Sequence, residues 1–533
     1  MTRELNSTED SAAPNADGDT FESLIERYGD NYRWFALGSV GLGSFGAFIM
    51  STSVNVAIPD VMGAYGIGQD VAQWLSTSFL AASTVSMLVA AWCIATWGLR
   101  VSYLLPSLLF IGASLLAMFS NSIELMILAR TLQGVASGIF LPLASYVTTR
   151  TFPPDKQGIG MGIFGILAVM GPAIGPYTGG LLIDTYGWKS VFLLPLPMLI
   201  ASLPLCQLFL PEREQDQTKQ PLDWTSIGLL SVGLTLLLNT STKGQDKGWT
   251  SDYTYIGFTL SAVAGVLFVW RQKMISNPLM DLRLYQYPAF SQAAIISFVY
   301  GVVLYSGMYT VPLFLQSVQS ITPTEAGLTL LPGGLMMAVG LLVGGSLSDR
   351  VPPYLVMFVG LVLLIYSFAV MHDANRFTSL AMMAWWVALG RIGMALMMPA
   401  INVAAFSSLP QNLLSQASGT TNFLRQMSGA IGVNLISVYL ARQTSLHTEH
   451  IVATQQADNP QTRIMLEGLI PGLHQSGVDQ SLQEPLAGWI LTNELYRQGL
   501  TLAFQDAFVA TALISIVALI PAWLLKRAMA ASR

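Results

Sequence analysis

Fourteen apolar runs, each of roughly twenty residues and with few charges, constrain this chain more than any other feature. An α-helix rises about 1.5 Å per residue, so such a run crosses a hydrocarbon core of about 30 Å. Charged residues make up 10% of the chain, against about 25% in soluble domains. The sequence therefore predicts an all-α polytopic membrane protein with fourteen transmembrane helices. The runs cover residues 34–57, 74–97, 101–119, 124–149, 158–182, 189–210, 224–242, 254–271, 289–312, 327–347, 354–371, 378–404, 418–440 and 505–526.

The connections between the runs indicate an orientation. An even number of spans puts both termini on one side of the membrane. If the N-terminal tail is cytoplasmic, that face holds fifteen Lys and Arg residues and the other face holds seven. Cytoplasmic loops of membrane proteins carry the excess of positive residues, so we expect both termini to be cytoplasmic.

Residues 1–33 form a polar, acidic tail in which positions 1–30 hold eight Asp or Glu and two Arg. The tail has neither a basic n-region nor a cleavage site, so we expect a disordered cytoplasmic segment rather than a signal peptide. A short amphipathic helix is expected near Phe21–Tyr28.

The runs divide into two six-helix halves, residues 34–210 and 289–527. The first covers 177 residues, and the second covers 176 once the 63 residues of the extracytoplasmic loop 441–503 are set aside. Residues 211–288 hold two inserted helices with cytoplasmic connections, and residues 528–533 form a C-terminal tail. The halves align at an offset of 257 residues, which pairs Pro142 with Pro399, Pro153 with Pro410 and Gly162 with Gly419. Such internal repeats are typical of secondary transporters, whose substrate site lies between the halves.

The run at 158–182 has a distinctive glycine and proline pattern. Glycines that recur every four residues lie in one row, where a neighbouring helix can approach closely. The two prolines each remove a backbone donor, so the helix should bend, and a neighbouring helix or a cavity must satisfy the freed carbonyls. Tight packing alone is the alternative to a conformational role. The positions are Gly162, Gly171, Pro172, Gly175, Pro176, Gly179 and Gly180.

The spacing of these residues resembles the antiporter signature in the fifth helix of drug exporters of the major facilitator superfamily. With the repeat and the run count, the chain resembles the fourteen-helix drug:proton antiporter branch (EmrB/QacA-like permeases) over residues 34–527. The resemblance implies a secondary active transporter of the bacterial inner membrane that exports amphipathic or hydrophobic compounds by proton antiport and alternating access. It also implies a periplasmic adaptor, which would dock at loop 441–503, and an outer-membrane channel as partners. A solvated connection is the alternative for this loop.

Three arginines occur inside apolar runs, where an arginine costs roughly 2.5–3.5 kcal/mol on insertion scales and so points to function. Arg130, Gln133 and Gly134 resemble the RxxQG motif of the family, in which the arginine assists proton movement. The alternative is an arginine that interhelical carbonyls satisfy for packing. Arg391 lies near the position of Arg130 in the repeat, and Arg425 shares a helix face with Asn422 and Gln426. These residues are candidates for translocation or coupling.

Two motifs concern gating and proton coupling. Asp349-Arg350 resembles the cytoplasmic gating motif of the family in the second half, but the equivalent turn of the first half, residues 91–98, lacks the aspartate and the arginine. The first run resembles the DxTxxNxALP signature and keeps Asn55, but Met50 stands where an aspartate is expected.

Proton coupling therefore needs another carboxylate. Those nearest to the spans lie at their ends, at Glu124, Asp184, Glu325, Asp349 and Asp506. Of these we select Asp506, on the expectation that it begins the last helix and faces the cavity between the halves. The alternative is an N-terminal cap of that helix.

Aromatic residues provide candidate substrate contacts, because aromatic surfaces adapt to varied apolar molecules and attract cations. Phe298, Tyr305 and Tyr309 share one face of their helix, and Trp386 lies in a later run. Contact with lipid or with the protein core is the alternative for these side chains.

Several classes of function are excluded by what the sequence lacks. No Gly-Lys dipeptide occurs, so there is no P-loop for an ATP-driven pump, and no HExxH or GxSxG motif indicates a hydrolase. We therefore expect neither an enzyme nor a cofactor or metal site, and no nucleic-acid partner. The alternatives to proton-coupled export are a proton-independent facilitator, a dedicated exporter of one metabolite, or a membrane interaction protein that transports nothing.

Overall fold

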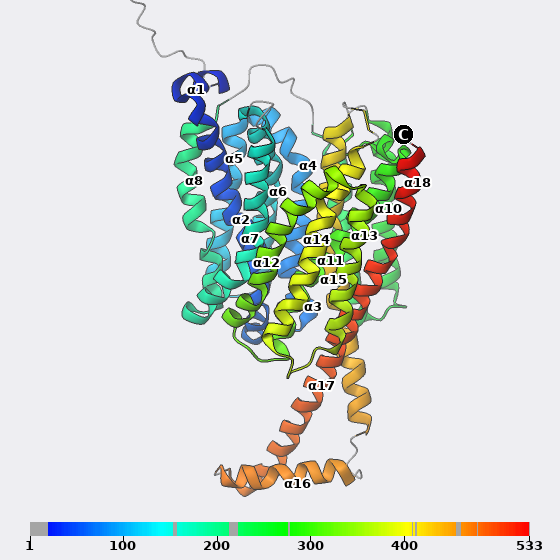
Figure 1. Ribbon diagram of the computed structural model, residues 1–533. Helices are drawn as coiled ribbons and strands as arrows, with labels where there is room; N and C mark the ends of the chain where they lie inside the picture. The colour runs from blue at the N-terminus through cyan, green and yellow to red at the C-terminus, as the bar shows by residue number, and fades with distance from the viewer. Residues whose placement is uncertain are drawn as a thin grey trace, which may run out of the picture.

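The computed structural model describes residues 20–152, 157–212, 222–275, 278–407, 409–410, 413–454, 460–476 and 478–531. Within these residues all regular structure is helical (Figure 1). The first half contains α1 (Phe21–Tyr28), η1 (Gly29–Asn31), α2 (Tyr32–Tyr65), α3 (Gln69–Ala72), α4 (Trp74–Trp97), α5 (Leu99–Met118), α6 (Ile123–Thr151), α7 (Gln157–Tyr186), η2 (Trp188–Leu193) and α8 (Leu196–Phe209). The insert contains α9 (Trp224–Lys247) and α10 (Asp252–Met274), followed by η3 (Leu282–Gln286). The second half contains α11 (Pro288–Ser317), α12 (Pro323–Arg350), α13 (Pro353–Val370), η4 (Met371–Asp373), α14 (Leu380–Phe406), α15 (Leu414–Thr454), α16 (Pro460–Gln475), α17 (Gln480–Val517) and α18 (Leu519–Ala531).

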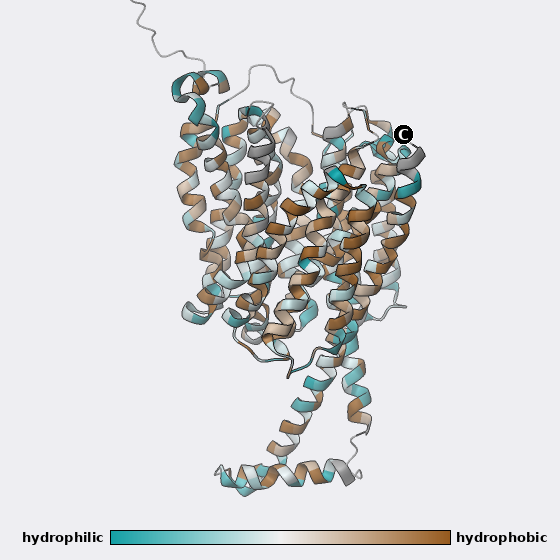
Figure 2. Cartoon of the chain, in the orientation of Figure 1, coloured by the Kyte–Doolittle hydropathy of each residue, from teal (hydrophilic) through white to brown (hydrophobic). Residues whose placement is uncertain are grey.

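Twelve helical segments in the described ranges are long and apolar enough to cross a membrane. The long bundle helices α4 and α15 are not among the twelve. In α15 the polar residues Asn422, Arg425 and Gln426 lower the hydropathy, although the helix runs through the bundle. Hydrophobic residues are concentrated along the bundle, and hydrophilic residues gather at α1 and at the opposite projection (Figure 2). The all-helical polytopic architecture that the apolar runs predict is present.

Helix α1 and the end of α18 lie at one end of the bundle, which we call the terminal end (Figure 1). From the other end, the hairpin end, a helical hairpin projects that is formed by the last turns of α15, by α16 and by the first turns of α17 (Figure 1). The short helix expected at Phe21–Tyr28 is present as α1, with Thr20 as its N-cap. The rest of the predicted tail, residues 1–19, lies outside the described residues.

The insert is tied to both halves at Thr242 of α9. Gln73 Nε2, in the first half, donates a hydrogen bond to Thr242 Oγ1 at 3.0 Å. Asn434 Nδ2, in α15, donates to the same oxygen at 2.9 Å. Both bonds are buried, so the insert packs as an integral part of the bundle where the halves meet.

The hairpin differs from the loop expected at 441–503. Helix α15 continues to Thr454 and α17 already begins at Gln480, so most of the expected loop extends the two bundle helices. The extensions pack closely, since a Cβ atom at Gly499 would lie 2.9 Å from the Thr448 nitrogen. Between the two extensions, helix α16 lies at the far tip of the hairpin (Figure 1).

The position of Asp506 also differs from expectation. Helix α17 begins after the N-cap Asp479, whose side chain accepts a hydrogen bond from the Ser481 N–H. Asp506 therefore lies well inside α17, and the prediction that it begins or caps the final helix is wrong. The apolar run at 505–526 covers only the last part of α17 and the first part of α18.

Candidate functional site

The glycine row of α7 packs against α2 within the first half. A Cβ atom at Gly175 would lie 2.7 Å from the carbonyl oxygen of Ile49, so only glycine permits this approach. Pro176 cannot donate to the carbonyl of Pro172, and Thr52 Oγ1 donates to that oxygen at 3.0 Å instead. The neighbouring helix thus satisfies the freed carbonyl, as a proline inside a membrane requires.

The opposite side of α7 contacts α12 of the second half, close to the hairpin end. A Cβ atom at Gly180 would lie 2.5 Å from the carbonyl carbon of Pro323, and one at Gly327 would lie 2.5 Å from the Cα of Tyr177. The backbone N–H of Thr324 donates to Asp184 Oδ2 at 3.0 Å. These contacts close the interface between the halves at the hairpin end.

Toward the terminal end, one glycine on each of these two helices faces open space. At Gly165 of α7 and at Gly345 of α12 no atom lies within 4 Å of where a Cβ would be. The surroundings of Gly162 and the side chain of Asp349 are outside what the structure describes, and Arg350 is exposed. The close packing of α7 on α12 is therefore established for their hairpin-end portions.

Asn55 joins three helices at the interface. Its Nδ2 donates to the carbonyl oxygen of Met308 in α11 at 3.1 Å, and Ser76 Oγ of α4 donates to its Oδ1 at 2.5 Å. The side chain is 5% exposed. The candidate asparagine of the first run thus links the two halves directly.

Gln426 forms a second link nearer the middle of the bundle. Its Nε2 donates to Ser83 Oγ of α4 at 2.6 Å, and Tyr305 OH of α11 donates to its Oε1 at 3.2 Å. Gln426 and Tyr305 are partly buried. Gln426, predicted for coupling, and Tyr305, predicted for substrate contact, thus belong to one chain of hydrogen bonds that links the halves through Ser83.

Arg130 is fully buried within the first half. Its Nε donates to the Leu75 carbonyl at 2.7 Å and its Nη1 donates to Gln133 Oε1 at 2.8 Å. Its guanidinium lies 4.3 Å from the ring centroid of Phe79, and its Nη2 is buried without a hydrogen-bond partner. Gly134 permits the approach of α4, because a Cβ there would lie 3.0 Å from the carbonyl carbon of Phe79. The motif therefore packs α6 closely against α4 and leaves the Arg130 Nη2 donor without a described acceptor.

The other two arginines lie in the second half. The guanidinium of Arg425 donates to Asn422 Oδ1 and lies 5.9 Å from the ring centroid of Tyr300. Arg391 Nη1 is buried and has no hydrogen-bond partner. Both arginines interact electrostatically with the Tyr300 phenol, whose hydroxyl also lacks a partner. Sequence reasoning missed Tyr300, which only the fold brings to both arginines.

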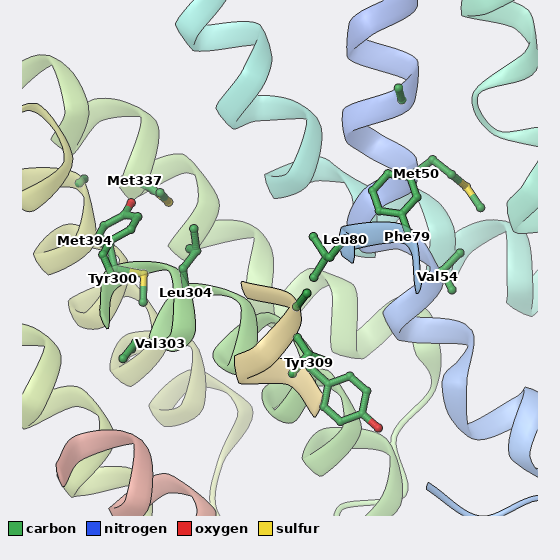
Figure 3. Packing of buried hydrophobic residues seen from close by; sticks show 14 of the residues in the cluster. Met50, Val54, Phe79, Leu80, Tyr300, Val303, Leu304, Tyr309, Met337 and Met394 are labelled. Carbon is green, nitrogen blue, oxygen red and sulfur yellow. The ribbon is translucent and has the colours of Figure 1, made fainter. Parts of the chain in front are cut away.

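The aromatic candidates are less open than the sequence predicts. Tyr309 is fully buried, and its hydroxyl donates to Ser437 Oγ at 3.5 Å. Trp386 is 7% exposed, while Phe298 and Tyr305 are partly buried. Tyr300 lies beside Met394 and Met337, whereas Met50 lies beside Phe79 (Figure 3). The site of the missing aspartate is therefore part of an apolar core.

The carboxylates are placed differently from the prediction for coupling. Asp506 Oδ2 accepts from Gln443 Nε2 at 2.9 Å and contacts His447 Nε2 at 2.7 Å, both in α15 of the same half. Glu325 belongs to the capping box of α12 with Thr322. The described contacts of Asp506 do not bring it to the interface between the halves.

Asp60 is a carboxylate that the sequence analysis overlooked. It lies in α2 just beyond the first apolar run, is partly buried, and its Oδ2 has no hydrogen-bond partner. It interacts electrostatically with Asp184, the acceptor for the α12 backbone. In the sequence, the Pro59-Asp60 pair at the end of the first apolar run is the feature that could have indicated this carboxylate. No group of three metal-ligating side chains occurs in the described ranges.

Comparison with known proteins agrees with this fold and with the resemblance drawn from the motifs. A family model described as Major Facilitator Superfamily matches residues 40–433. The chain is 29% identical to multidrug resistance protein Stp of Mycobacterium tuberculosis, over 90% of this chain and 89% of that protein. It is 26% identical to multidrug export protein EmrB of Escherichia coli, over 92% and 94%.

A solved bacterial homologue of the human lysosomal transporter Spinster is similar in fold, with a TM-score of 0.63 and 17% identity over 94% of this chain and 98% of that one. The resemblance to the drug-exporter branch is thus confirmed by relatives that cover nearly the whole chain. The chain belongs to the Major Facilitator Superfamily, a family of membrane transporters rather than enzymes.

Proposed function

We propose that this protein is a secondary active transporter that exports amphipathic or hydrophobic compounds by alternating access. The observation that carries the proposal is the interface between the halves, which is closed by glycine contacts and a few hydrogen bonds near the hairpin end. Separation of α7 from α12 at these contacts would open the space between the halves toward the hairpin end. The relatives Stp and EmrB, which are named for multidrug resistance and multidrug export, support the direction and the substrate class.

The proposed arrangement has fourteen spans, with α4 and α15 added to the twelve helical segments that meet the length and hydropathy criteria. We assign residues 34–210 and 289–527 to the two halves and residues 211–288 to the insert. Both termini are assigned to the cytoplasm of a bacterial inner membrane. In that orientation the contacts at the hairpin end close the outer face.

Export is tested by expressing the chain in a host that lacks its main drug pumps and screening resistance to amphipathic antibiotics and dyes. Resistance that rises for several such compounds, with lower intracellular accumulation, supports the proposal. Unchanged resistance and accumulation throughout the screen, at normal membrane levels of the protein, would argue against it.

Orientation has its own test. Cys93 and Cys206 are both buried and are replaced by serine. A single cysteine at the exposed Ser476 of the hairpin is expected to react in spheroplasts with an impermeant maleimide. A single cysteine at Gln215, in the connection between α8 and α9, is expected to stay unlabelled until the membrane is permeabilised. The opposite pattern would reverse the assigned orientation.

A proton-independent facilitator, or an exporter dedicated to one metabolite, is the second candidate. It is favoured by Met50, which is fully buried among apolar residues at the position of the expected aspartate. A proton antiporter needs a group whose protonation changes as access alternates. Our first choice, Asp506, has its described partners within one half. Asp60 has an unpartnered oxygen and lies near Asp184, which accepts a hydrogen bond from α12, so Asp60 is the better candidate.

Substrate addition to proteoliposomes is expected to release protons from wild type and from Asp506→Asn, and not from Asp60→Asn. The reason is that separation of α7 from α12 would free Asp184 from the Thr324 N–H and let water reach the neighbouring Asp60, and both changes affect the proton affinity of a carboxyl group. A pH-sensitive dye reports the release. Proton release that persists in Asp60→Asn but is lost in Asp506→Asn would restore Asp506 as the coupling residue. If wild type releases no protons, the protein is a proton-independent facilitator.

The hairpin supports a further partner, a periplasmic adaptor that leads to an outer-membrane channel. Apolar side chains on it are exposed, among them Ile464 and Trp489, which are 68% and 64% exposed. The hairpin projects from the face assigned to the periplasm (Figure 1). The other partners are the amphipathic substrate, the lipid bilayer and, for an antiporter, protons.

A further inference from the structure

The insert meets the two halves at a buried hydrogen-bonded contact. Gln73, which precedes α4, and Asn434 of α15 donate to the same oxygen, Thr242 Oγ1 of α9, at 3.0 and 2.9 Å. All three side chains are at most 4% exposed. Gln73 directly follows α3, which lies toward the hairpin end of the bundle (Figure 1). The contact therefore belongs to the end of the interface that α7 and α12 close.

On the side of the second half, the insert is held by hydrogen bonds and by apolar packing. Besides Thr242, Asn434 Nδ2 has a second acceptor in α9, the Leu238 carbonyl, at 3.2 Å. Phe268 of α10 and Phe423 of α15 belong to one buried apolar cluster, and Leu88 of α4 is only partly buried where it packs against this cluster. Near Thr242 the insert is thus attached more firmly to α15 than to the first half.

On the side of the first half, the hydrogen bond between Gln73 and Thr242 can break without leaving either group unpaired. Gln73 Nε2 also donates to the Asp70 carbonyl at 3.1 Å. Thr242 would keep Asn434 as its donor, and its hydroxyl donates to the Leu238 carbonyl at 3.0 Å. Since a buried polar group without any partner is what makes a lost hydrogen bond costly, this bond is suited to break and form again.

We propose that the Gln73–Thr242 hydrogen bond is a latch that holds the hairpin end closed and breaks when this end opens, while Asn434 keeps the insert on the second half. The inference rests on the proposed function, because alternating access is what separates the halves. Thr242 is then a positioning residue that acts on the balance between the two access states. At the start of α9, Trp224 packs edge to face on Trp92 of α4, with ring centroids 6.4 Å apart. Rocking of the halves brings that end together as the hairpin end opens, so this contact can persist as a pivot.

Pairs of spin labels follow the insert against each half, in the full chain in nanodiscs with both native cysteines replaced. Labels at the exposed residues Phe119 and Tyr255 report the distance from the first half to the insert, and labels at Tyr255 and Phe377 report the distance from the insert to the second half. Thr242→Val is expected to raise the ratio of long to short Phe119–Tyr255 distances by about twofold to tenfold, the effect of one hydrogen bond. The Tyr255–Phe377 distance should stay as in wild type.

Gln73→Met removes the same hydrogen bond from the other side and should give a shift of similar size. The double variant Gln73→Met/Thr242→Val should add little, because both substitutions remove one shared bond. Thr242→Ser keeps the hydroxyl and should restore the wild-type ratio. The matched control is Ser241→Ala, since this neighbouring hydroxyl is also buried and its described hydrogen bond goes to the Leu237 carbonyl of its own helix. It should leave both distances unchanged.

Dye efflux from cells that express wild type separates the latch from the proposed function, because the label distances do not depend on transport. Phe119–Tyr255 distances that match wild type in both Thr242→Val and Gln73→Met would overturn the latch, and so would a Tyr255–Phe377 distance that lengthens in their place. Loss of Thr242→Val from the membrane, with no shift in Gln73→Met, would show a packing role and would overturn it too. None of these results touches the export function, which wild type without any dye efflux would refute.

Discussion

Arg130→Ala is expected to lower substrate efflux by about a hundredfold while the amount of protein in the membrane stays near wild type. The guanidinium is fully buried and donates to the Leu75 carbonyl and to Gln133, so its loss removes one buried, charge-assisted hydrogen bond from each acceptor. Removal of one partner from a buried charged network costs about 2–5 kcal/mol, which corresponds to a factor of about thirty or more. Efflux of a fluorescent amphipathic dye, normalised to immunoblotted membrane protein, measures the effect.

Arg130→Lys should restore little, because an ammonium cannot donate in two fixed directions to α4 and to Gln133 at once. The matched control is Arg376→Ala, which removes a half-exposed arginine from the hairpin end and should retain efflux. A role in packing predicts a different result, namely loss of Arg130→Ala from the membrane in proportion to its loss of efflux. That outcome would remove Arg130 from the translocation machinery.

Gly180→Leu is expected to hold the two halves apart at the hairpin end and to reduce transport about five- to 150-fold. A Cβ atom at this position already meets the backbone of Pro323, so a larger side chain cannot be accommodated when α7 closes on α12. Overpacking costs about 1–3 kcal/mol, which changes the ratio of the two access states by that factor. Spin labels at the exposed residues Tyr186 and Leu328 report the separation, which should lengthen.

The control for this substitution is Gly165→Leu on the same helix, where no atom lies within 4 Å of a Cβ position. It should leave both the label distance and the transport rate near wild type. An unchanged distance in Gly180→Leu, together with normal transport, would mean that α7 and α12 need not close at Gly180. Alternating access would then not depend on the contact between α7 and α12 at Gly180.

The architecture could be predicted because lipid permits few solutions for long apolar runs. The need for a neighbour at Pro176 was also predictable, and Thr52 supplies it. The assignment of contacts was not. Spacing alone could not reveal that Gly175 faces α2 of its own half while Gly180 faces α12 of the other, because that depends on how the helices pack in three dimensions.

The hairpin and the polar groups show a second limit. The extensions of α15 and α17 are amphipathic rather than apolar. Hydropathy therefore ended α15 too early and began α17 too late, which made Asp506 a terminal residue. Asp60 lies just past an apolar run and was set aside with the connections, although the fold buries one of its oxygens. Tyr300 reads as one more core aromatic until the fold brings it to Arg391 and Arg425.

The most direct test of the central claim is transport by the purified full chain in proteoliposomes. Three vesicle populations are compared: wild type, Arg130→Ala and protein-free. Amphipathic dansyl probes are added on the face opposite the hairpin, the side on which α1 and the end of α18 lie. The account predicts saturable movement of at least one probe toward the hairpin face in wild type, and rates near the protein-free level in Arg130→Ala. Wild-type vesicles that move no probe faster than protein-free vesicles would contradict it.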